Sequence, residues 1–397
     1  MKAVIATDSL KGSLSSMEAG EAIREGILKA KPDAEVIIKP LADGGEGTTD
    51  ALIEGMNGER VPLRVTGPFG NPVDCYYGCL RESHTAVMEM ASAAGITLEP
   101  VRDPLRATTR GVGEMILHAI EHGCRDFIIG IGGSATNDGG IGMLKALGYE
   151  FWAQDGQDVG EGGQALAKIA SFSEKNVDPR LRDCRFRVAC DVTNPLCGPM
   201  GATYIYGPQK GVTEDLLEPL DRGMANYARV VTSAPEEIFP EKNPADESCA
   251  SAELTECSAA PALAEMPGAG AAGGMGFAFL RFLNAELTPG VDLILNAVGL
   301  EKEVKDADVV ITGEGRLDHQ TAMGKAPIGV ARLGKKYGAR VIAFAGSIAP
   351  GAEACNKAGI DAFFPILREV CTLKEAMDPQ NAKENLSRTA GQVFRLL

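Results

Sequence analysis

Short apolar runs alternate with glycine-rich polar loops and helical patterns along most of the chain. Five of these runs are typical of strands and span residues 2–6, 35–38, 127–131, 308–311 and 340–344. Because the runs are continuously apolar rather than alternating, they indicate strands buried on both faces, as in a parallel sheet covered by helices. Apolar residues at helical spacing follow the first run, after a capping-box pattern at residues 15–18 and before Pro32. The pattern predicts an α/β fold with a doubly wound, Rossmann-like parallel sheet.

The middle of the chain follows a different pattern. Residues 60–80 are typical of antiparallel strands around Gly-Pro and Asn-Pro turns, and residues from 149 onward are typical of a hairpin that turns at Asp155-Gly156. We therefore expect two domains. A discontinuous Rossmann-like domain of residues 1–60 plus 285–397 is interrupted by a mixed α/β domain of residues 61–284, and residues 105–148 are left open to either domain.

The composition and charge of the chain argue against two classes of binding partner. The 397 residues carry a formal net charge of −15, which argues against nucleic acid or an anionic membrane as the main partner, because both need a basic face. No run approaches the ~18–20 apolar residues of a membrane helix. The N-terminus lacks the apolar core of a signal peptide, and the 10 cysteines are scattered. We expect a cytoplasmic protein with reduced thiols, a small-molecule substrate and neither a nucleic-acid nor a membrane partner.

One acidic segment stands apart. Residues 234–267 hold eight acidic residues and a single basic residue, Lys242, together with several prolines. The composition predicts a solvated loop. The alternative is a lid beside the glycine-rich loop that follows the segment.

Two glycine-rich loops are candidate anion sites. Residues 132–140 follow a predicted buried strand, and Ser134 and Asn137 add side-chain donors there. Residues 268–273 match G-x-G-x-x-G, but no predicted strand precedes Gly268, so a dinucleotide fingerprint is disfavoured. Backbone N–H groups of such loops can approach a phosphate at a helix N-terminus. Helix capping and close backbone packing are the structural alternatives.

Acidic residues recur at or just after the predicted strand ends, namely Asp8, Asp43, Glu46, Asp138, Asp191, Glu314 and Asp318. Mg²⁺ binds one or two carboxylates together with substrate phosphates, and a hydroxyl nucleophile needs a base within hydrogen-bond reach. We expect a few of these residues to serve in this way, whereas helix caps and turns are the alternative for each. Lys11 and Arg316 are the candidate cations for an anionic ligand. The H-x-x-E-H sequence of residues 118–122 is discounted as a zinc site, because His118 lies off the apolar stripe of its helix.

Taken together, these blocks resemble the type-1 glycerate kinases. The matching blocks keep the order of that family and span residues 8–14, 41–48, 132–140, 189–196, 206–211, 268–274 and 311–318. The resemblance covers nearly the whole chain. It implies ATP-dependent phosphorylation of D-glycerate by in-line transfer, with Mg²⁺, in a cleft between two α/β domains. It favours the 2-hydroxyl, giving 2-phosphoglycerate, over the 3-hydroxyl.

The resemblance also suggests roles for the candidate residues. Asp191, after the strand of residues 186–189, is the expected general base, and Lys11 is the second expected catalytic residue. The expected substrate-binding residues are Ser9, Lys11, Arg316 and Asp318. The ATP phosphates are expected at Ser134, Asn137, Gly268, Gly270, Gly273 and Gly274. The expected Mg²⁺ ligands are Asp43 and Glu314.

Other functions stay open on the sequence. A nicotinamide-dependent dehydrogenase requires a strand before Gly268, and a zinc hydrolase requires zinc at His118 and His122. A non-catalytic sensor of sugar acids or nucleotides would bind its ligand without turnover. A homo-oligomer is also left open.

Overall fold

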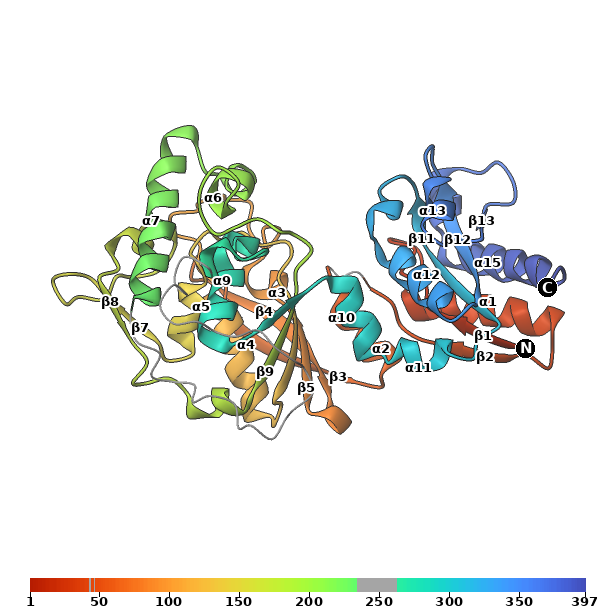
Figure 1. Ribbon diagram of the computed structural model, residues 1–397, viewed down its shortest axis with the longest axis horizontal. Coiled ribbons are helices and arrows are strands. Elements are labelled where there is room, and N and C mark those ends of the chain that lie inside the picture. The colour runs from red at the N-terminus through yellow and green to blue at the C-terminus, as the bar shows by residue number, and fades with distance from the viewer. Residues whose placement is uncertain (43, 46, 234–262) are drawn as a thin grey trace. The chain divides into compact units, whose positions relative to one another are not determined.

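The chain divides into two compact units (Figure 1). The computed structural model describes residues 1–42, 44–45, 47–233 and 263–397. Unit 1 consists of residues 1–59 and 289–397, and unit 2 consists of residues 60–288. Residues 105–148, which the sequence left open to either domain, lie in unit 2. Asp43, Glu46 and most of the acidic segment lie outside the described residues.

Unit 1 is a parallel sheet covered by helices on both faces. Within the described residues its strands follow the order β13-β12-β11-β1-β2. Their bounds are β1 Lys2–Ile5, β2 Glu35–Ile38, β11 Val309–Leu317, β12 Arg340–Ile348 and β13 Ala362–Pro365. Neighbouring strands of this sheet pair in parallel along their described residues. The predicted α/β fold with a parallel Rossmann-like sheet is thereby confirmed.

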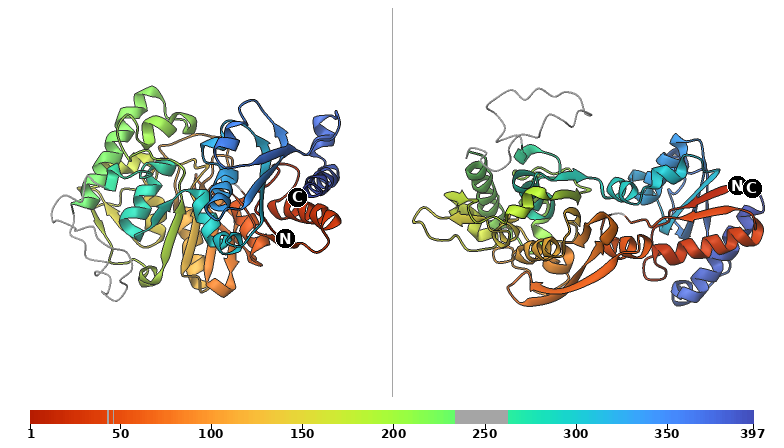
Figure 2. Two further views of the ribbon diagram at one scale, coloured as in Figure 1. Left: turned by 45° about the vertical axis from the view of Figure 1, so that its right-hand side comes forward. Right: turned by 90° about the horizontal axis from the view of Figure 1, so that it is seen from below.

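The helices of unit 1 occupy the two faces of this sheet. They are α1 Ser16–Ala30, α2 Thr48–Gly55, α10 Gly290–Ala297, α11 Leu300–Val304, α12 Ala326–Lys336, α13 Ala354–Lys357, α14 Leu373–Met377 and α15 Pro379–Phe394. Helices α1 and α15 pack side by side on one face, where Ile5 and Ile311 point (Figures 1 and 2). On the other face, Gly334 of α12 lies against Val310 and Val341. Alternate strand residues therefore meet helices on opposite sides, which explains the continuously apolar runs.

Helix α1 forms as its sequence predicts. The Ser15 side chain accepts a hydrogen bond from the Glu18 N–H, and the Glu18 carboxylate accepts one from the Ser15 N–H. This capping box is confirmed, and the helix ends at Ala30, two residues before Pro32. Close packing on α15 depends on Gly26, because a Cβ there would lie 2.1 Å from the Ser387 carbonyl oxygen.

The strand order of unit 1 places a ligand crevice. Strand β1 pairs with β2 on one side and with β11 on the other. The chain therefore adds β2 on one side of β1, and later adds β11, β12 and β13 on the other side. In open α/β sheets, ligands bind outside the carboxyl ends of the strands at such a switch point. The loops that follow β1 and β11 carry several of the predicted site residues.

Unit 2 is a mixed α/β unit. Its described strands form a sheet of order β10-β9-β6-β5-β4-β3 and a small pair, β7-β8. Their bounds are β3 Glu59–Thr66, β4 Pro72–Leu80, β5 Thr85–Glu89, β6 Asp126–Gly130, β7 Glu150–Trp152, β8 Ser171–Ser173, β9 Arg185–Ala189 and β10 Glu286–Thr288. Strand β4 is antiparallel to β5, whereas β5, β6, β9 and β10 run parallel. The helices are α3 Ala91–Ala94, α4 Arg110–Glu121, α5 Ile141–Ala146, α6 Ala202–Tyr206, α7 Glu214–Thr232 and α9 Ala271–Leu283.

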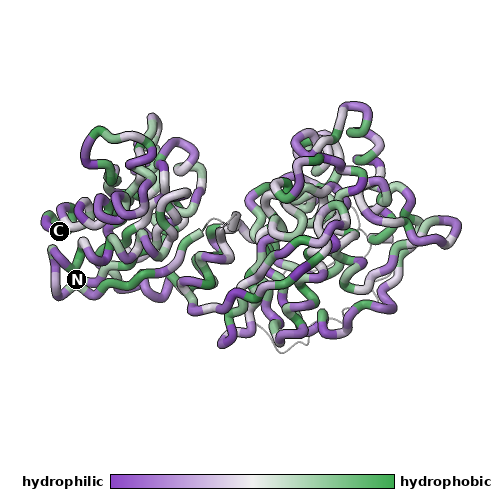
Figure 3. Tube along the Cα trace, turned by 180° about the vertical axis from the view of Figure 1, so that it is seen from behind, coloured by the Kyte–Doolittle hydropathy of each residue, from purple (hydrophilic) through white to green (hydrophobic). Residues whose placement is uncertain are grey.

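An aromatic cluster fills the core of unit 2. Phe127 stacks on Phe186 with ring centroids 4.8 Å apart, and Tyr227 meets Phe277 edge to face. Figure 3 shows hydrophobic and hydrophilic segments alternating along the tube of both units, as the chain passes between core and surface.

The hairpin predicted from residue 149 onward forms, but as a short pairing beside a second partner strand. The turn at Asp155-Gly156 forms, and the Ala153 N–H donates to the Gln157 carbonyl at 2.8 Å. An antiparallel bridge from Trp152 to Asp158 and the Val159 N–H, which donates to the Phe151 carbonyl at 3.2 Å, join β7 to the residues after the turn. Strand β7 also pairs with β8, which the sequence did not predict. Gly160 and Gly162 have φ of +82° and +80°, so the chain leaves the extended conformation there.

Candidate active site

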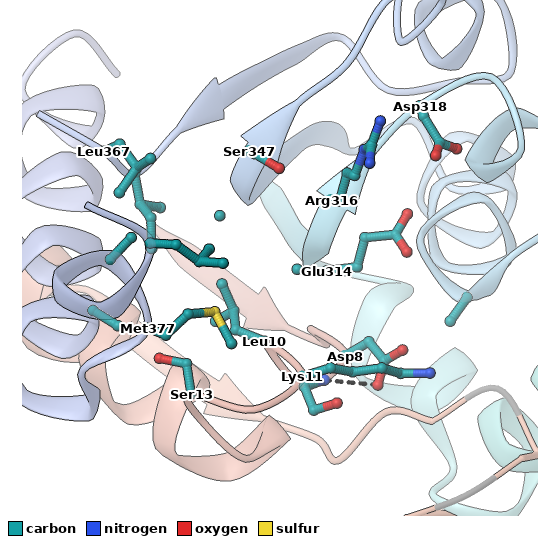
Figure 4. A pocket seen from close by; sticks show the side chains of 18 of the residues that line it. Asp8, Leu10, Lys11, Ser13, Glu314, Arg316, Asp318, Ser347, Leu367 and Met377 are labelled. Atoms are coloured by element: carbon teal, nitrogen blue, oxygen red, sulfur yellow. Dashed lines mark hydrogen bonds between the residues drawn. The ribbon is translucent and has the colours of Figure 1, made fainter. Parts of the chain in front are cut away.

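A cavity of about 500 Å³ lies in unit 1 at the carboxyl ends of its strands (Figure 4). It is lined by the loop after β1, the ends of β11 and β12, and the segment after β13 that includes α14. We call this space the site cavity. Five residues that the sequence predicted for the site line it, namely Ser9, Lys11, Glu314, Arg316 and Asp318, together with the strand-end carboxylate Asp8.

Strand β11 carries the cavity residues because it runs past the end of β1. The Asp8 N–H donates to the Gly313 carbonyl at 2.8 Å, which joins the two loops side by side. Gly313 also packs against β12, since a Cβ there would lie 2.1 Å from the Phe344 carbonyl oxygen. A glycine at this position lets Glu314 and Arg316 follow immediately at the edge of the cavity.

Glu314 is a carboxylate in an unfavourable environment for its charge. Its Oε1 accepts a hydrogen bond from the Thr321 hydroxyl at 2.6 Å, and its Oε2 lies 3.9 Å from the Lys325 ammonium. Burial raises the pKa of the Glu314 carboxyl, and these two contacts only partly offset that effect. A partly desolvated carboxylate of this kind favours a nearby cation.

Asp8 and Asp318 are held by backbone groups. The Asp8 carboxylate accepts the Ser9 N–H at 2.7 Å. The Asp318 carboxylate accepts the N–H groups of Gln320 and Thr321 at 2.9 and 3.2 Å. Desolvation opposes the Asp318 charge, but these N–H groups outweigh it and lower the pKa of Asp318. Asp318 therefore closes a turn as well as lining the cavity.

Sequence reasoning missed two polar residues and one whole wall of the cavity. Lys325 immediately precedes α12, and Ser347 is the penultimate residue of strand β12. The apolar wall, which Ile366, Leu367, Leu373, Ala376 and Met377 form, was not predicted as part of the site. No motif in the sequence distinguishes these apolar residues from those of an ordinary surface segment.

In unit 2 the predicted residues lie on three loops that pack on one another. These are residues 132–140 after β6, residues 190–196 after β9, and residues 268–274 at the start of α9. The Gly139 N–H donates to the Gly273 carbonyl at 2.9 Å, and the Gly270 N–H donates to the Asn194 carbonyl at 3.0 Å. The loops form one assembly at the carboxyl ends of the parallel strands.

The glycines at 268–274 allow this packing. A Cβ would lie 2.2 Å from the Pro195 carbonyl oxygen at Gly270 and 2.1 Å from the Thr136 carbonyl oxygen at Gly273. Gly273 and Gly274 also have φ of +70° and +90°, which glycine adopts at little cost, and Ala272 before them has φ of +53°. Gly268, Gly270, Gly273 and Gly274 are all buried. In this structure their close approach is to protein backbone, the structural alternative that the sequence left open.

Ser134 and Asn137 are also tied into the assembly. The ammonium of Lys210, a fully buried residue, donates to the Ser134 hydroxyl and to the Thr136 carbonyl, both at 2.7 Å. The Asn137 amide donates to the Thr203 hydroxyl at 3.0 Å, and the residue is fully buried. Gly132 and Gly133 are exposed and form the accessible part of the loop.

Burial also sets the charges of this assembly. Desolvation lowers the pKa of Lys210 to about 7, although the nearby Asp138 carboxylate opposes the shift. The Asp138 carboxylate accepts hydrogen bonds from the Thr109 N–H, the Thr109 hydroxyl and the Gly140 N–H. In this structure the carboxylate therefore links two loops of the protein instead of facing a ligand. The burial of Lys210 was not predictable from the sequence, because a lysine beside glutamine and glycine in a loop is usually exposed.

Asp191 lies directly after β9 and is exposed. This position leaves its carboxylate accessible to a substrate. Asp43, the other expected Mg²⁺ ligand, lies outside the described residues.

Two features bear on the other functions. The described residues immediately before Gly268 form a helical turn, so the strand that a dinucleotide site requires is not found among them. His118 accepts or donates a hydrogen bond with Tyr77 at 3.2 Å and stacks on His122. No group of three or more His, Cys, Asp or Glu placed to hold a metal occurs in the described part of the chain. Across the same residues, no helix has the length and apolar character required to cross a bilayer.

Comparison with known proteins gives full-length matches. A model of the glycerate kinase family matches residues 3–397. The chain is 45% identical to a protein named glycerate kinase from Bacillus subtilis (strain 168), over 99% of this chain and 97% of that protein. It is 44% identical to glycerate 2-kinase from Escherichia coli (strain K12), over 100% and 98%. A crystal structure from Salmonella typhimurium LT2, described as a candidate glycerate kinase 2, superposes with a TM-score of 0.85 at 42% identity, covering 99% of this chain and 97% of that one.

Proposed function

The chain belongs to the glycerate kinase family, and we propose that it transfers the terminal phosphoryl group of ATP to the 2-hydroxyl of D-glycerate. The product is 2-phosphoglycerate. The relative named glycerate 2-kinase, matched along its length, supports the choice of hydroxyl. The observation that carries the chemistry is the site cavity, where carboxylates and cations converge at the switch point of a parallel sheet.

The charges of the site cavity suit phosphoryl transfer. Lys11, Arg316 and Lys325 face one space in a chain whose net charge is −15. Enzymes of this class act almost entirely by positioning the reactants and by neutralising charge on the transferred group. We propose that Lys11 and Arg316 hold the glycerate carboxylate or the moving phosphoryl group, with Ser9 and Asp318 beside them.

The cavity also fits a magnesium ion. Mg²⁺ prefers oxygen ligands and binds one or two carboxylates together with substrate phosphates. The Glu314 carboxylate is partly desolvated, and its contacts with Thr321 and Lys325 only partly offset the cost of burying its charge. Asp8 lines the same cavity. We propose that these two residues hold the ion, with Asp43 as a third ligand from the sequence prediction. When bound, the ion would neutralise charge on the phosphate oxygens of ATP.

A general base is needed to accept the proton of the glycerate hydroxyl. We propose Asp191, whose exposed carboxylate follows β9. We further propose that unit 2 meets the ATP phosphates through the exposed Gly132 and Gly133. Ser134, Asn137 and the glycines at 268, 270, 273 and 274 hold that turn in place.

The decisive experiment is ³¹P NMR of the product that wild-type protein forms from ATP, Mg²⁺ and D-glycerate. The proposal expects ADP and 2-phosphoglycerate, with no product from a matched reaction lacking the protein. A 3-phosphoglycerate signal would contradict the choice of hydroxyl. Absence of any phosphorylated glycerate would contradict the function itself, and NAD(P)H absorbance in the same preparation then tests the dehydrogenase alternative.

A further inference from the structure

The site cavity has two chemically different halves (Figure 4). Asp8, Lys11, Glu314, Arg316 and Asp318 gather in one half. The other half is lined by Leu10, Ile366, Leu367, Leu373, Ala376 and Met377. In Figure 4 the labelled members of this apolar half, Leu10, Leu367 and Met377, lie together and apart from the charged groups.

Glycerate accounts for only the charged half. Every carbon of glycerate carries oxygen, so the molecule has no apolar surface to bury. A cavity of about 500 Å³ is also within the range of about 300–1,000 Å³ that larger ligands occupy. ATP, the second substrate under the proposed function, combines a flat base of low polarity with a highly charged triphosphate. Its two parts match the two halves of the cavity.

The apolar half leaves hydrophobic surface in water. Leu373 is 78% exposed, and Leu367 and Met377 are each 37% exposed. Apolar side chains that gather at one exposed place commonly mark a binding site. Methionine suits an aromatic ligand, because its flexible, polarisable thioether makes favourable contacts with ring edges.

A single hydroxyl interrupts this apolar half. The Ser13 Oγ is buried and has no hydrogen-bond partner among the described residues. Ser13 lines the cavity, and Figure 4 shows its hydroxyl beside Met377. A buried polar atom without a partner is costly unless a ligand or water meets it. A ring nitrogen or a ribose hydroxyl of a nucleotide supplies such a partner.

From these observations we infer that the apolar half of the site cavity binds the purine base of ATP. The triphosphate then extends towards Lys11, Arg316 and Lys325. This inference rests on the proposed function, because it takes ATP as the phosphoryl donor. It assigns base recognition to the segment from Ile366 to Met377, which forms the apolar wall of the cavity.

The test compares neutral polar substitutions that leave the net charge unchanged. Leu373→Asn and Met377→Gln remove apolar surface from the cavity wall. Val370→Asn is the matched control, because Val370 is fully exposed on the same segment and does not line the cavity. Isothermal titration with MgATP, in the absence of glycerate, measures nucleotide binding independently of turnover. Far-UV circular dichroism checks that each variant is folded.

The two cavity variants are expected to weaken MgATP binding by about tenfold, as the loss of part of one apolar contact implies. The control is expected to bind as wild type does. Inorganic tripolyphosphate with Mg²⁺ lacks the base, so its dissociation constant is expected to stay the same in all four proteins. Steady-state assays should show a raised KM for ATP, with the KM for D-glycerate within about twofold of wild type.

Two outcomes would overturn the inference. Unchanged MgATP binding in both cavity variants would show that the base lies elsewhere. A raised KM for D-glycerate with an unchanged KM for ATP would show that the apolar half closes over the acceptor instead. Failure of the proposed function is distinguishable, since wild-type protein would then form no phosphorylated glycerate at all.

Discussion

Replacing Lys210 with methionine should change how the stability of the protein depends on pH. The Lys210 ammonium is fully buried and contacts Ser134 and Thr136. Burial lowers its pKa to about 7 in the folded protein, from a reference value of 10.5. Methionine has a similar length and no titrating group, so the variant isolates the effect of the amine.

The sign of the effect follows from proton binding. Between pH 7 and 10.5 the unfolded chain carries a proton on Lys210 that the folded protein has lost. The free energy of unfolding therefore rises with pH across this window, by roughly 1.4 kcal/mol per pH unit for one proton. From pH 7.5 to 9.0 the wild-type protein should gain roughly 2 kcal/mol that the variant does not gain.

The lost hydrogen bonds add an effect that does not depend on pH. Methionine leaves the buried Thr136 carbonyl and the Ser134 hydroxyl without their donor, which costs about 1–3 kcal/mol. At pH 9.0 the variant should therefore be clearly less stable than the wild type. At pH 7.5 the difference should be smaller, because folding of the wild-type protein then still costs more free energy to remove the Lys210 proton, which the unfolded chain keeps up to pH 10.5.

Urea unfolding followed by far-UV circular dichroism at pH 7.5 and 9.0 measures this difference. Lys168→Met is the matched control, because Lys168 is an exposed lysine of the same unit. Its difference from wild type should not change with pH. A Lys210→Met difference that stays constant within about 0.5 kcal/mol over this window would refute the reasoning, because Lys210 would then be charged throughout.

Four further variants test other parts of the structure. Asp191→Asn should lower kcat by about 10²–10⁴ in a coupled ADP-release assay, and a variant that keeps more than about a tenth of the wild-type kcat would contradict a role as base. Gly273→Ala should lower the free energy of unfolding by about 3 kcal/mol or more, since its Cβ would lie 2.1 Å from the Thr136 carbonyl oxygen. Gly156→Ala, with φ of +77° but open space, should cost only about 1–2 kcal/mol when both variants are compared with wild type by urea unfolding. Glu314→Gln should raise the Mg²⁺ concentration for half-maximal rate by at least about tenfold, and an unchanged value would remove Glu314 from the metal site.

The local pattern of the sequence was sufficient for the parallel sheets. Continuous apolar runs predicted the strands because burial on both faces leaves no polar side of the strand to detect. The second partner of β7 was not predictable in this way. Strand β7 pairs with β8 as well as with the residues after Gly156, and Phe151 stacks on Phe172 of β8, which lies outside any local window.

The candidate site divides in a similar way. Residues at strand ends were predictable, because the carboxyl ends of parallel strands meet at one edge of a sheet. The glycine-rich loop at 268–274 was ambiguous, since glycine suits both an anion cradle and close backbone packing. Only the Thr136 backbone at Gly273 distinguishes the two. The burial of Lys210 likewise depends on loops that are distant in sequence.

The place of β1 between β11 and β2 affects the order in which the protein can form during synthesis. Strand β1 ends at Ile5, but its neighbour β11 begins at Val309, about 300 residues later. At about 5–20 residues per second, the ribosome takes roughly 15–60 seconds to supply that neighbour. Unit 2 is complete at residue 288, before β11 emerges. The nascent protein should therefore fold unit 2 first. Until residues 289–397 are synthesised, the first 59 residues lack the rest of their sheet and should be accessible to chaperones and proteases.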